Sequence, residues 1–285
     1  MPSACSSAIR AAVEAPDRSG ELLGVVDAAL FVRLLGAGDD RCSTRIGVIG
    51  VVAADAVRLP CALALASTSS ELPLTALRPS AGHPLTIGSG RVRWVSAAGP
   101  VTVTIAREWA PPRIGAVLVL PDRLAALQAA LGELRIGVEE RAMAGLSRAA
   151  AGKLSPDDAV AGLLGNGPGL TPSGDDLLAG FVLAARAFGL AIRAVRTAIA
   201  ESAGPRTTAL SAQLLQHALR GECIPELAEV IRAMGGPQPL EPVLERLLRV
   251  GHTSGAALAG GVAIVATAIS GRAIRGIPKT TGGWK

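Results

Sequence analysis

Hydrophobic and polar residues follow different patterns in the two halves of the chain. From about residue 20 to 115, short apolar runs rich in β-branched residues are separated by Gly and Pro, which is typical of strands. The segments RVRWV (91–95) and VTVTIA (101–106) alternate polar and apolar residues, and the intervening SAAGP predicts a turn between antiparallel strands. The segment 1–20 instead predicts a short amphipathic helix that ends at a polar break.

After Pro121 the apolar residues recur at helical spacing. The predicted helices span residues 156–164, 175–188, 191–203, 208–219, 224–233, 240–250 and 254–270. A sheet followed by helices predicts an α+β fold. We expect a β-rich domain over residues 1–120, forming an antiparallel sheet or partial barrel, and a mostly α-helical bundle over residues 121–285. The tail from residue 276 is expected to be loose.

Composition excludes several classes of function. The net charge of +5 comes from scattered Arg rather than a basic patch, and only 2% of residues are aromatic, so we expect no nucleic-acid partner. The apolar stretch 255–270 is shorter than the ~20 residues of a membrane span. The N-terminus lacks the apolar core of a signal peptide. We therefore expect a cytoplasmic protein without a membrane partner.

The cysteines do not suggest a metal site. Cys5, Cys42, Cys61 and Cys223 form no CxxC pair, and none lies near a His at metal-ligand spacing. We interpret them as buried or incidental thiols in a reducing compartment. We expect no metal centre and no cofactor.

Polar chemistry concentrates in the stretch GNGPGLTPSGDD, residues 165–176, directly before an apolar run. A stiff loop with a capped helix explains part of it, because Thr171 or Ser173 can cap and an acid in the first turn favours the helix dipole. A small-anion site is the alternative, since glycines admit close backbone approach and a helix N-terminus attracts anions. Asp175 or Asp176 would then accept a hydrogen bond from a substrate amide, act as a general base or hold a bridging cation. The candidate binding residues here are Asn166, Gly167, Gly169, Thr171, Ser173 and Gly174.

Two further clusters accompany this loop. Residues 251–255 (GHTSG) open a second Ala/Gly-rich helix, in which Ser254-Gly255 echoes the earlier Ser173-Gly174. His252 is a candidate catalytic group. The remaining candidate anion ligands are Thr253, Ser254 and Gly255, together with Arg206, Thr207 and Thr208. His83 and His217 are set aside because they lack comparable polar neighbours in the sequence.

The three segments GNGPGLTPSGDDLLAG, RTTALSAQLLQHALRGE and GHTSGAALAGGVAI together resemble a bacterial family that includes the AllH-type subunit of oxamate carbamoyltransferase. The similarity covers about residues 160–270. It implies a role in anaerobic purine and allantoin breakdown, where oxalurate and phosphate give oxamate and carbamoyl phosphate. It also implies assembly with other subunits of a transferase complex.

The resemblance implies residue roles as hypotheses. Thr171, Ser173 and the loop backbone would hold phosphoryl or carboxylate oxygens of phosphate, carbamoyl phosphate, oxamate or oxalurate. Asp175 or Asp176 would accept the carbamoyl NH₂, and Arg206 or His252 would neutralise developing charge. Two alternatives stay open: a non-catalytic assembly subunit, and a small-molecule phosphotransferase that would require a nucleotide.

Overall fold

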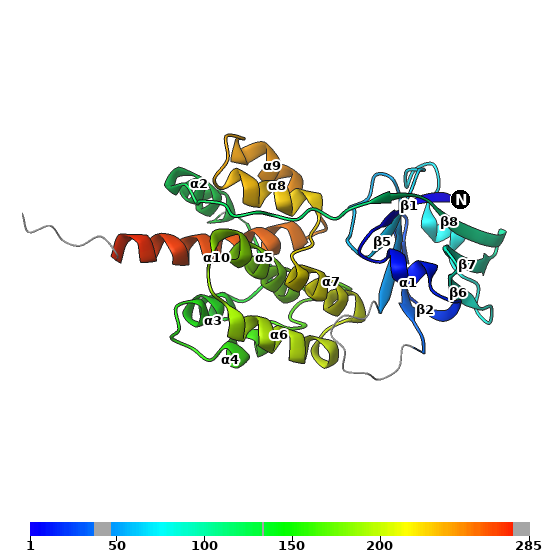
Figure 1. Ribbon diagram of the computed structural model, residues 1–285, viewed down its shortest axis with the longest axis horizontal. Helices are drawn as coiled ribbons and strands as arrows, with labels where there is room; N and C mark the ends of the chain where they lie inside the picture. Colours follow the sequence, from blue (N-terminus) through cyan, green and yellow to red (C-terminus); the bar gives the residue numbers. More distant parts are fainter. Residues whose placement is uncertain (37–46, 133, 276–285) are drawn as a thin grey trace, which may run out of the picture.

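The structure is a computed structural model that describes residues 1–36, 47–132 and 134–275. It consists of a barrel and a group of helices that lie side by side, joined by an extended segment after the last strand (Figure 1). The predicted α+β class is confirmed. Cys42 and the tail expected to be loose lie outside the described residues.

Eight strands form the closed barrel in the order β1-β5-β4-β3-β2-β6-β7-β8. Pairs β1–β8 and β4–β5 are parallel and the other neighbours are antiparallel, including the predicted β7–β8 hairpin. The strands are β1 (Pro2–Ser6), β2 (Arg18–Val26), β3 (Ala29–Leu34), β4 (Val48–Val52), β5 (Ala62–Leu65), β6 (Leu85–Gly88), β7 (Arg91–Ser96) and β8 (Gly99–Trp109), with a 3₁₀ turn η1 (Leu74–Leu77).

One expectation for this part was wrong. The segment 1–20 contains strand β1 and the start of β2, and only the short helix α1 (Arg10–Glu14) between them is helical. The local helical pattern does not determine the structure of residues 2–6, because β1 lies between β5 and β8 and its backbone groups pair with both strands. The same strand closes the barrel, in which the two parallel pairs, β1–β8 and β4–β5, stand among antiparallel neighbours.

The helices agree closely with the predicted spans. They are α2 (Pro121–Gly132), α3 (Glu140–Ala150), α4 (Pro156–Ala161), α5 (Ser173–Phe188), α6 (Arg193–Arg206), α7 (Ala209–Arg220), α8 (Pro225–Ala233), α9 (Leu240–Leu248) and α10 (Ser254–Arg275). Helix α5 is buried along nearly its whole length and packs mainly against α10. Both run through the middle of the helical part, and α10 projects beyond it (Figure 1).

Glycines allow α5 and α10 to pack backbone to backbone. A Cβ at Gly180 would lie 2.1 Å from the carbonyl oxygen of Leu258, and one at Gly261 would lie 2.3 Å from that of Leu177. Gly180 and Gly261 stand as far apart in the sequence as Ser173 and Ser254, and so do Leu177 and Leu258. The sequence echo therefore corresponds to two equivalent halves of one helix crossing.

Helix α10 also contains a stretch, Ser254–Gly271, that is long and apolar enough to cross a membrane by length and composition. Within the described residues, 56% of that stretch is buried inside the protein. It contacts α2, α3, α8 and α9 as well as α5. Its apolar character is thus used in packing, as in the core helix of a soluble protein.

Two hydrophobic clusters underlie the two parts. One contains side chains of the strands and the other contains side chains from residue 114 onward, while Leu210 of α7 packs into the barrel cluster.

The three described cysteines, Cys5, Cys61 and Cys223, are free and buried, and burial raises the pKa of each thiol to about 12. The division into domains 1–120 and 121–285 stays a prediction.

Candidate functional site

A pocket of about 580 Å³ lies where the barrel meets the helices. The barrel side contributes residues of β2 to β4 and of the segment that follows β4, and the other side comes from α5, α7, α8, α10 and nearby loops. Most of the lining is apolar. The oxygen-bearing side chains that line it are Asp55, Thr171, Asp176, Glu222 and Ser254. The pocket therefore brings together three of the residues expected from sequence, Thr171, Asp176 and Ser254.

The two adjacent aspartates have different surroundings. Asp175 is buried, and its Oδ1 accepts a 3.0 Å hydrogen bond from the backbone N–H of Gly165. Its Oδ2 accepts a hydrogen bond from the Thr207 hydroxyl. Burial raises the pKa of Asp175, although these hydrogen bonds partly oppose the rise. Asp175 thus ties the glycine-rich loop and the end of α6 to the start of α5.

Asp176 instead lines the pocket. The residue is 8% exposed, and its Oδ2 is buried without a hydrogen-bond partner among the described residues. Burial raises its pKa to about 7; the Ser254 hydroxyl opposes this rise and the nearby Asp175 charge adds to it. A buried acceptor without a partner costs about 1–3 kcal/mol. A carboxyl group with this pKa can both accept and donate a proton near neutral pH.

The glycine-rich loop folds back on the helix that follows it. Gly165, Gly167 and Gly169 have positive φ angles of 71°, 122° and 88°. The Gly174 N–H donates to the carbonyl oxygen of Asn166, and a Cβ at Gly167 would lie 2.8 Å from the Ser173 nitrogen. The Gly174 donor is therefore already used within the protein. The anion-cradle role of Asn166, Gly167, Gly169 and Gly174 stays a prediction.

The starts of α5 and α10 are joined by their hydroxyl groups. Ser173 Oγ lies 2.8 Å from Thr253 Oγ1, and Thr171 Oγ1 lies 3.4 Å from Ser254 Oγ. Gly255 is buried, and a Cβ there would lie 1.9 Å from the Leu247 carbonyl oxygen. The positive ends of two helix dipoles consequently meet beside the pocket, near Thr171 and Ser254.

The other expected residues lie outside the pocket lining. His252 and Arg206 are exposed, and Thr208 caps α7 by accepting a 3.1 Å hydrogen bond from the Ser211 N–H. Thr207 contacts Asp175 rather than the pocket. The structure thus does not bring Arg206 or His252 to Asp176 through any interaction among the described residues.

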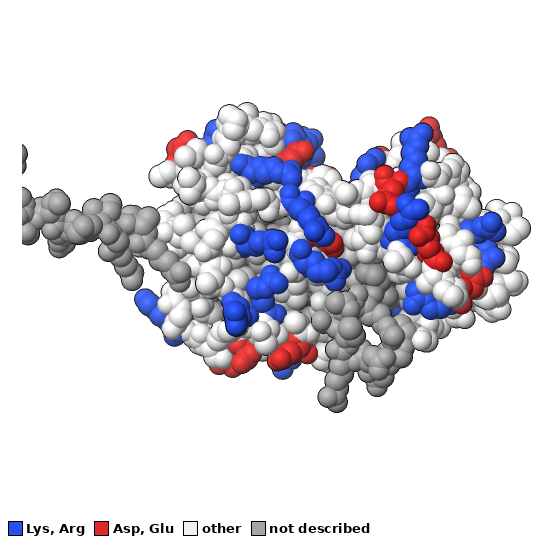
Figure 2. Space-filling view, viewed as in Figure 1, with Lys and Arg blue, Asp and Glu red and all other residues white. Residues whose placement is uncertain are grey.

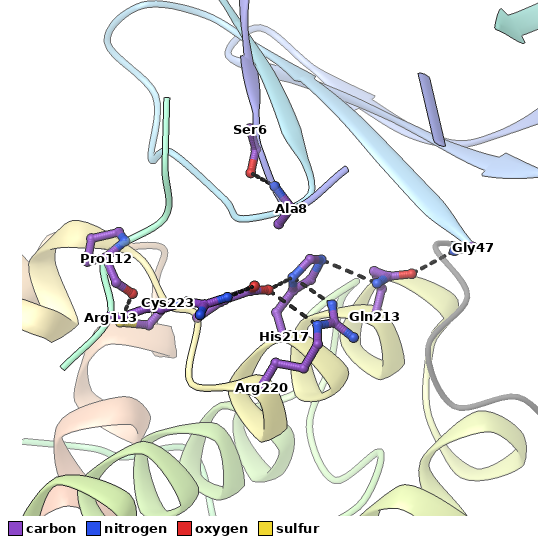
Figure 3. Close-up of polar contacts among 10 residues, drawn as sticks. Ser6, Ala8, Gly47, Pro112, Arg113, Gln213, His217, Arg220 and Cys223 are labelled. Carbon is purple, nitrogen blue, oxygen red and sulfur yellow. Dashed lines mark hydrogen bonds and ion pairs between the residues drawn. The ribbon is translucent and has the colours of Figure 1, made fainter. Parts of the chain in front are cut away.

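A buried polar cluster beside the pocket was missed from the sequence. Gln213 Oε1 accepts from the backbone N–H groups of Gly47 and Val48, at 2.7 and 3.4 Å, so its Nε2 faces His217 Nε2 at 3.3 Å (Figure 3). His217 Nδ1 lies 2.8 Å from Glu222 Oε2. The same Nδ1 also lies 2.9 Å from Arg220 Nη2, so Glu222 and Arg220 both contact this ring nitrogen.

Burial and nearby charges favour a neutral His217 and an ionised Glu222. Burial lowers the pKa of His217 and keeps the ring neutral at pH 7. The hydrogen bond from His217, with Arg113 and Arg220 nearby, lowers the pKa of Glu222 to about 2. The sequence signal was available in HALRGE, because His217, Arg220 and Glu222 lie within one turn and a half of each other. Glu222 also lines the pocket, so the cluster connects the barrel, the helices and the pocket.

The fold and the pocket define an α+β protein in which a closed barrel and a helical part enclose a largely apolar pocket with a buried carboxyl group. Within that class, the family model described as oxamate carbamoyltransferase subunit AllH matches residues 163–266, and this match supports membership of that family. Thr171, Asp176, Glu222 and Ser254 all fall inside the matched range. No solved structure matches the chain.

Proposed function

We propose that this chain is a cytoplasmic subunit of an oxamate carbamoyltransferase-type complex and that its pocket binds the carbamoyl or amide end of the substrate at Asp176. The observation that carries the proposal is the buried, unpartnered Oδ2 of Asp176, a residue that lines a pocket large enough for a small molecule. An amide NH₂ would supply the missing donor. The adjoining carboxylate of oxamate or oxalurate would lie toward Thr171 and Ser254, at the positive ends of α5 and α10.

The reaction implied is phosphorolysis of oxalurate, in which phosphate forms a C–O bond to the carbamoyl carbon and the C–N bond to oxamate breaks. The leaving nitrogen needs a proton, and phosphate loses one. With a pKa of about 7, Asp176 is suited to supply that proton in its neutral form. The apolar walls exclude water and strengthen such a hydrogen bond.

The pocket also supports the multi-subunit part of the proposal. No Lys or Arg lines the pocket within the described residues, whereas phosphate and carbamoyl phosphate carry charges that need cationic partners. We infer that another subunit supplies them. This chain would then position the carbamoyl group, and the phosphate-binding half of the site would come from a partner.

Thermal unfolding of the purified chain with oxamate, carbamoyl phosphate, phosphate and ATP tests the proposal. We expect stabilisation by oxamate and less by phosphate alone; a ligand at 100 times its dissociation constant adds about 2.7 kcal/mol. Asp176→Asn should remove the oxamate effect. Its matched control is Asp157→Asn, an exposed acid in the first turn of α4. An unchanged oxamate response in Asp176→Asn contradicts the proposed site. No response to any compound favours the assembly subunit, and stabilisation by ATP alone favours the phosphotransferase.

A further inference from the structure

A second recess, of about 330 Å³, lies between α6 and α7. It is distinct from the pocket at the barrel. Its lining consists of Arg193, Arg196, Thr197, Ala200, Gln216, Leu219 and Arg220. Three of these side chains are cationic and none is acidic. The recess is therefore a local concentration of positive charge.

Two of the three arginines are held in place by the protein. Arg196 Nη2 donates a 2.8 Å hydrogen bond to the carbonyl oxygen of Leu219, and Arg220 Nε lies 3.4 Å from Glu222 Oε2. Arg193 is exposed and has no ion-pair partner among the described residues. The like charges repel one another, and an anion between them would relieve that repulsion.

The surrounding surface adds to the positive potential. Lys and Arg side chains gather over this face of the helical part, while acidic side chains lie mostly toward its edges (Figure 2). Arg186, in the last turn of α5, packs over the adjacent Gly221, where a Cβ would lie 3.0 Å from its Nε. Such a field attracts anions toward the recess.

We propose that this recess binds a compact phosphate-bearing anion. Guanidinium groups match phosphate oxygens with paired N–H donors, and several of them converging on one small cavity is the usual construction of a phosphate site. The Thr197 hydroxyl and the Gln216 amide add neutral donors at the rim. The proposal is independent of the substrate pocket, which no cationic residue lines in the described structure.

The recess and the pocket share one connection. Arg220 lines the recess and contacts Glu222, and Glu222 lines the pocket. A phosphate group that hydrogen-bonds Arg220 would compete with Glu222 for it. The anion is thus placed where its binding changes the partners of a pocket residue.

Isothermal titration of the full chain with pyrophosphate, at constant ionic strength, tests the proposal. Arg193→Gln removes a cation without a structural partner, and we expect pyrophosphate to bind about tenfold more weakly. Arg78→Gln is the control, since Arg78 is exposed on the barrel and its loss changes the net charge equally. The affinity of the Arg78→Gln variant for pyrophosphate should stay within about twofold of that of the original protein. Arg196→Gln should also weaken binding, with circular dichroism to confirm folding.

Three results would overturn the proposal. The first is no measurable heat of binding with pyrophosphate in the original protein. The second is equal weakening by Arg78→Gln and Arg193→Gln, which indicates general charge attraction. The third is malonate binding as tight as pyrophosphate binding, which removes the phosphate assignment. None of these outcomes depends on the pocket at Asp176, which oxamate tests separately.

Discussion

At the scale of single residues, the start of α5 shows how burial separates two adjacent carboxyl groups. Consecutive residues at a helix start point about 100° apart. Asp175 therefore faces the loop and Thr207, which supply donors to both of its oxygens, whereas Asp176 lines the pocket and its Oδ2 has no donor among the described residues. Asp175 serves the structure of the loop. Asp176 carries a free-energy cost that a ligand can remove.

Asp176→Asn should stabilise the protein at high pH. The folded-state pKa of Asp176 is raised to about 7 from 3.8, so the folded state binds more protons than the unfolded state between these values. The free energy of unfolding of the original protein consequently falls as pH rises from about 4 to 7. Urea unfolding should show the variant more stable at pH 8, by on the order of 3 kcal/mol, and equally stable near pH 3.5. A less stable variant at pH 8 would contradict this assignment.

Asp175→Ala should have the opposite effect. The substitution leaves the half-buried N–H of Gly165 and the hydroxyl of Thr207 without their acceptor, which costs about 1–3 kcal/mol. Chemical denaturation at pH 7 measures this loss. Asp157→Ala, at the exposed first turn of α4, should lose less than about 1 kcal/mol. Equal losses in the two variants would mean that the Asp175 contacts contribute no more than a helix dipole.

At the scale of elements, the crossing of α5 and α10 depends on glycine. Because a Cβ at Gly180 would lie 2.1 Å from a backbone carbonyl oxygen of α10, Gly180→Ala must push the helices apart. We expect a loss of about 1–3 kcal/mol in the free energy of unfolding, measured by denaturant titration. Gly145→Ala in α3 is the matched control, since its Cβ would only make ordinary contact with Leu154 at 3.6 Å. Higher helix propensity should make that variant neutral or more stable by up to about 1 kcal/mol.

The helices could be predicted from the sequence because the apolar spacing of each is encoded locally. The segment 1–20 could not, since β1 is defined by its pairing with β5 and β8, which are distant in the sequence. The candidate site residues show the same difference between local signals and contacts that are distant in the sequence. Thr171, Asp176 and Ser254 stand out locally, whereas Glu222 becomes a pocket residue only when α7 packs on the barrel.

At the scale of the whole molecule, the buried cluster of Gln213, His217 and Glu222 connects parts that are far apart along the chain. Gln213 holds the start of β4 through Gly47 and Val48. Glu222 pairs with Arg113, in the extended segment that joins the barrel to α2. Because the polar groups are buried, each must keep its partner, and the cluster specifies how the helices meet the barrel.

This arrangement predicts sensitivity to acid. The folded-state pKa of Glu222 is lowered to about 2, so its contribution is complete above the unfolded value of 4.5 and is lost as pH falls from 4.5 toward 2. The lowered pKa of His217 acts in the same direction, because below pH 6.5 the unfolded state takes up the proton more readily. The free energy of unfolding should therefore fall as pH decreases below 6.5, because of His217, and fall further between pH 4.5 and 2, because of Glu222.

The variant Glu222→Gln measures how much of this acid sensitivity comes from Glu222. At pH 7 we expect a loss on the order of 3 kcal/mol in urea unfolding, because the variant lacks the charge that Arg113, Arg220 and His217 stabilise. The difference from the original protein should shrink as pH falls and vanish near pH 2. Glu229→Gln breaks an ion pair with Arg246 in which the Glu229 side chain is 38% exposed, and it should cost at most about 1 kcal/mol at any pH. A Glu222→Gln loss that stays constant from pH 7 to 2 would show that shape, not charge, holds the two parts together.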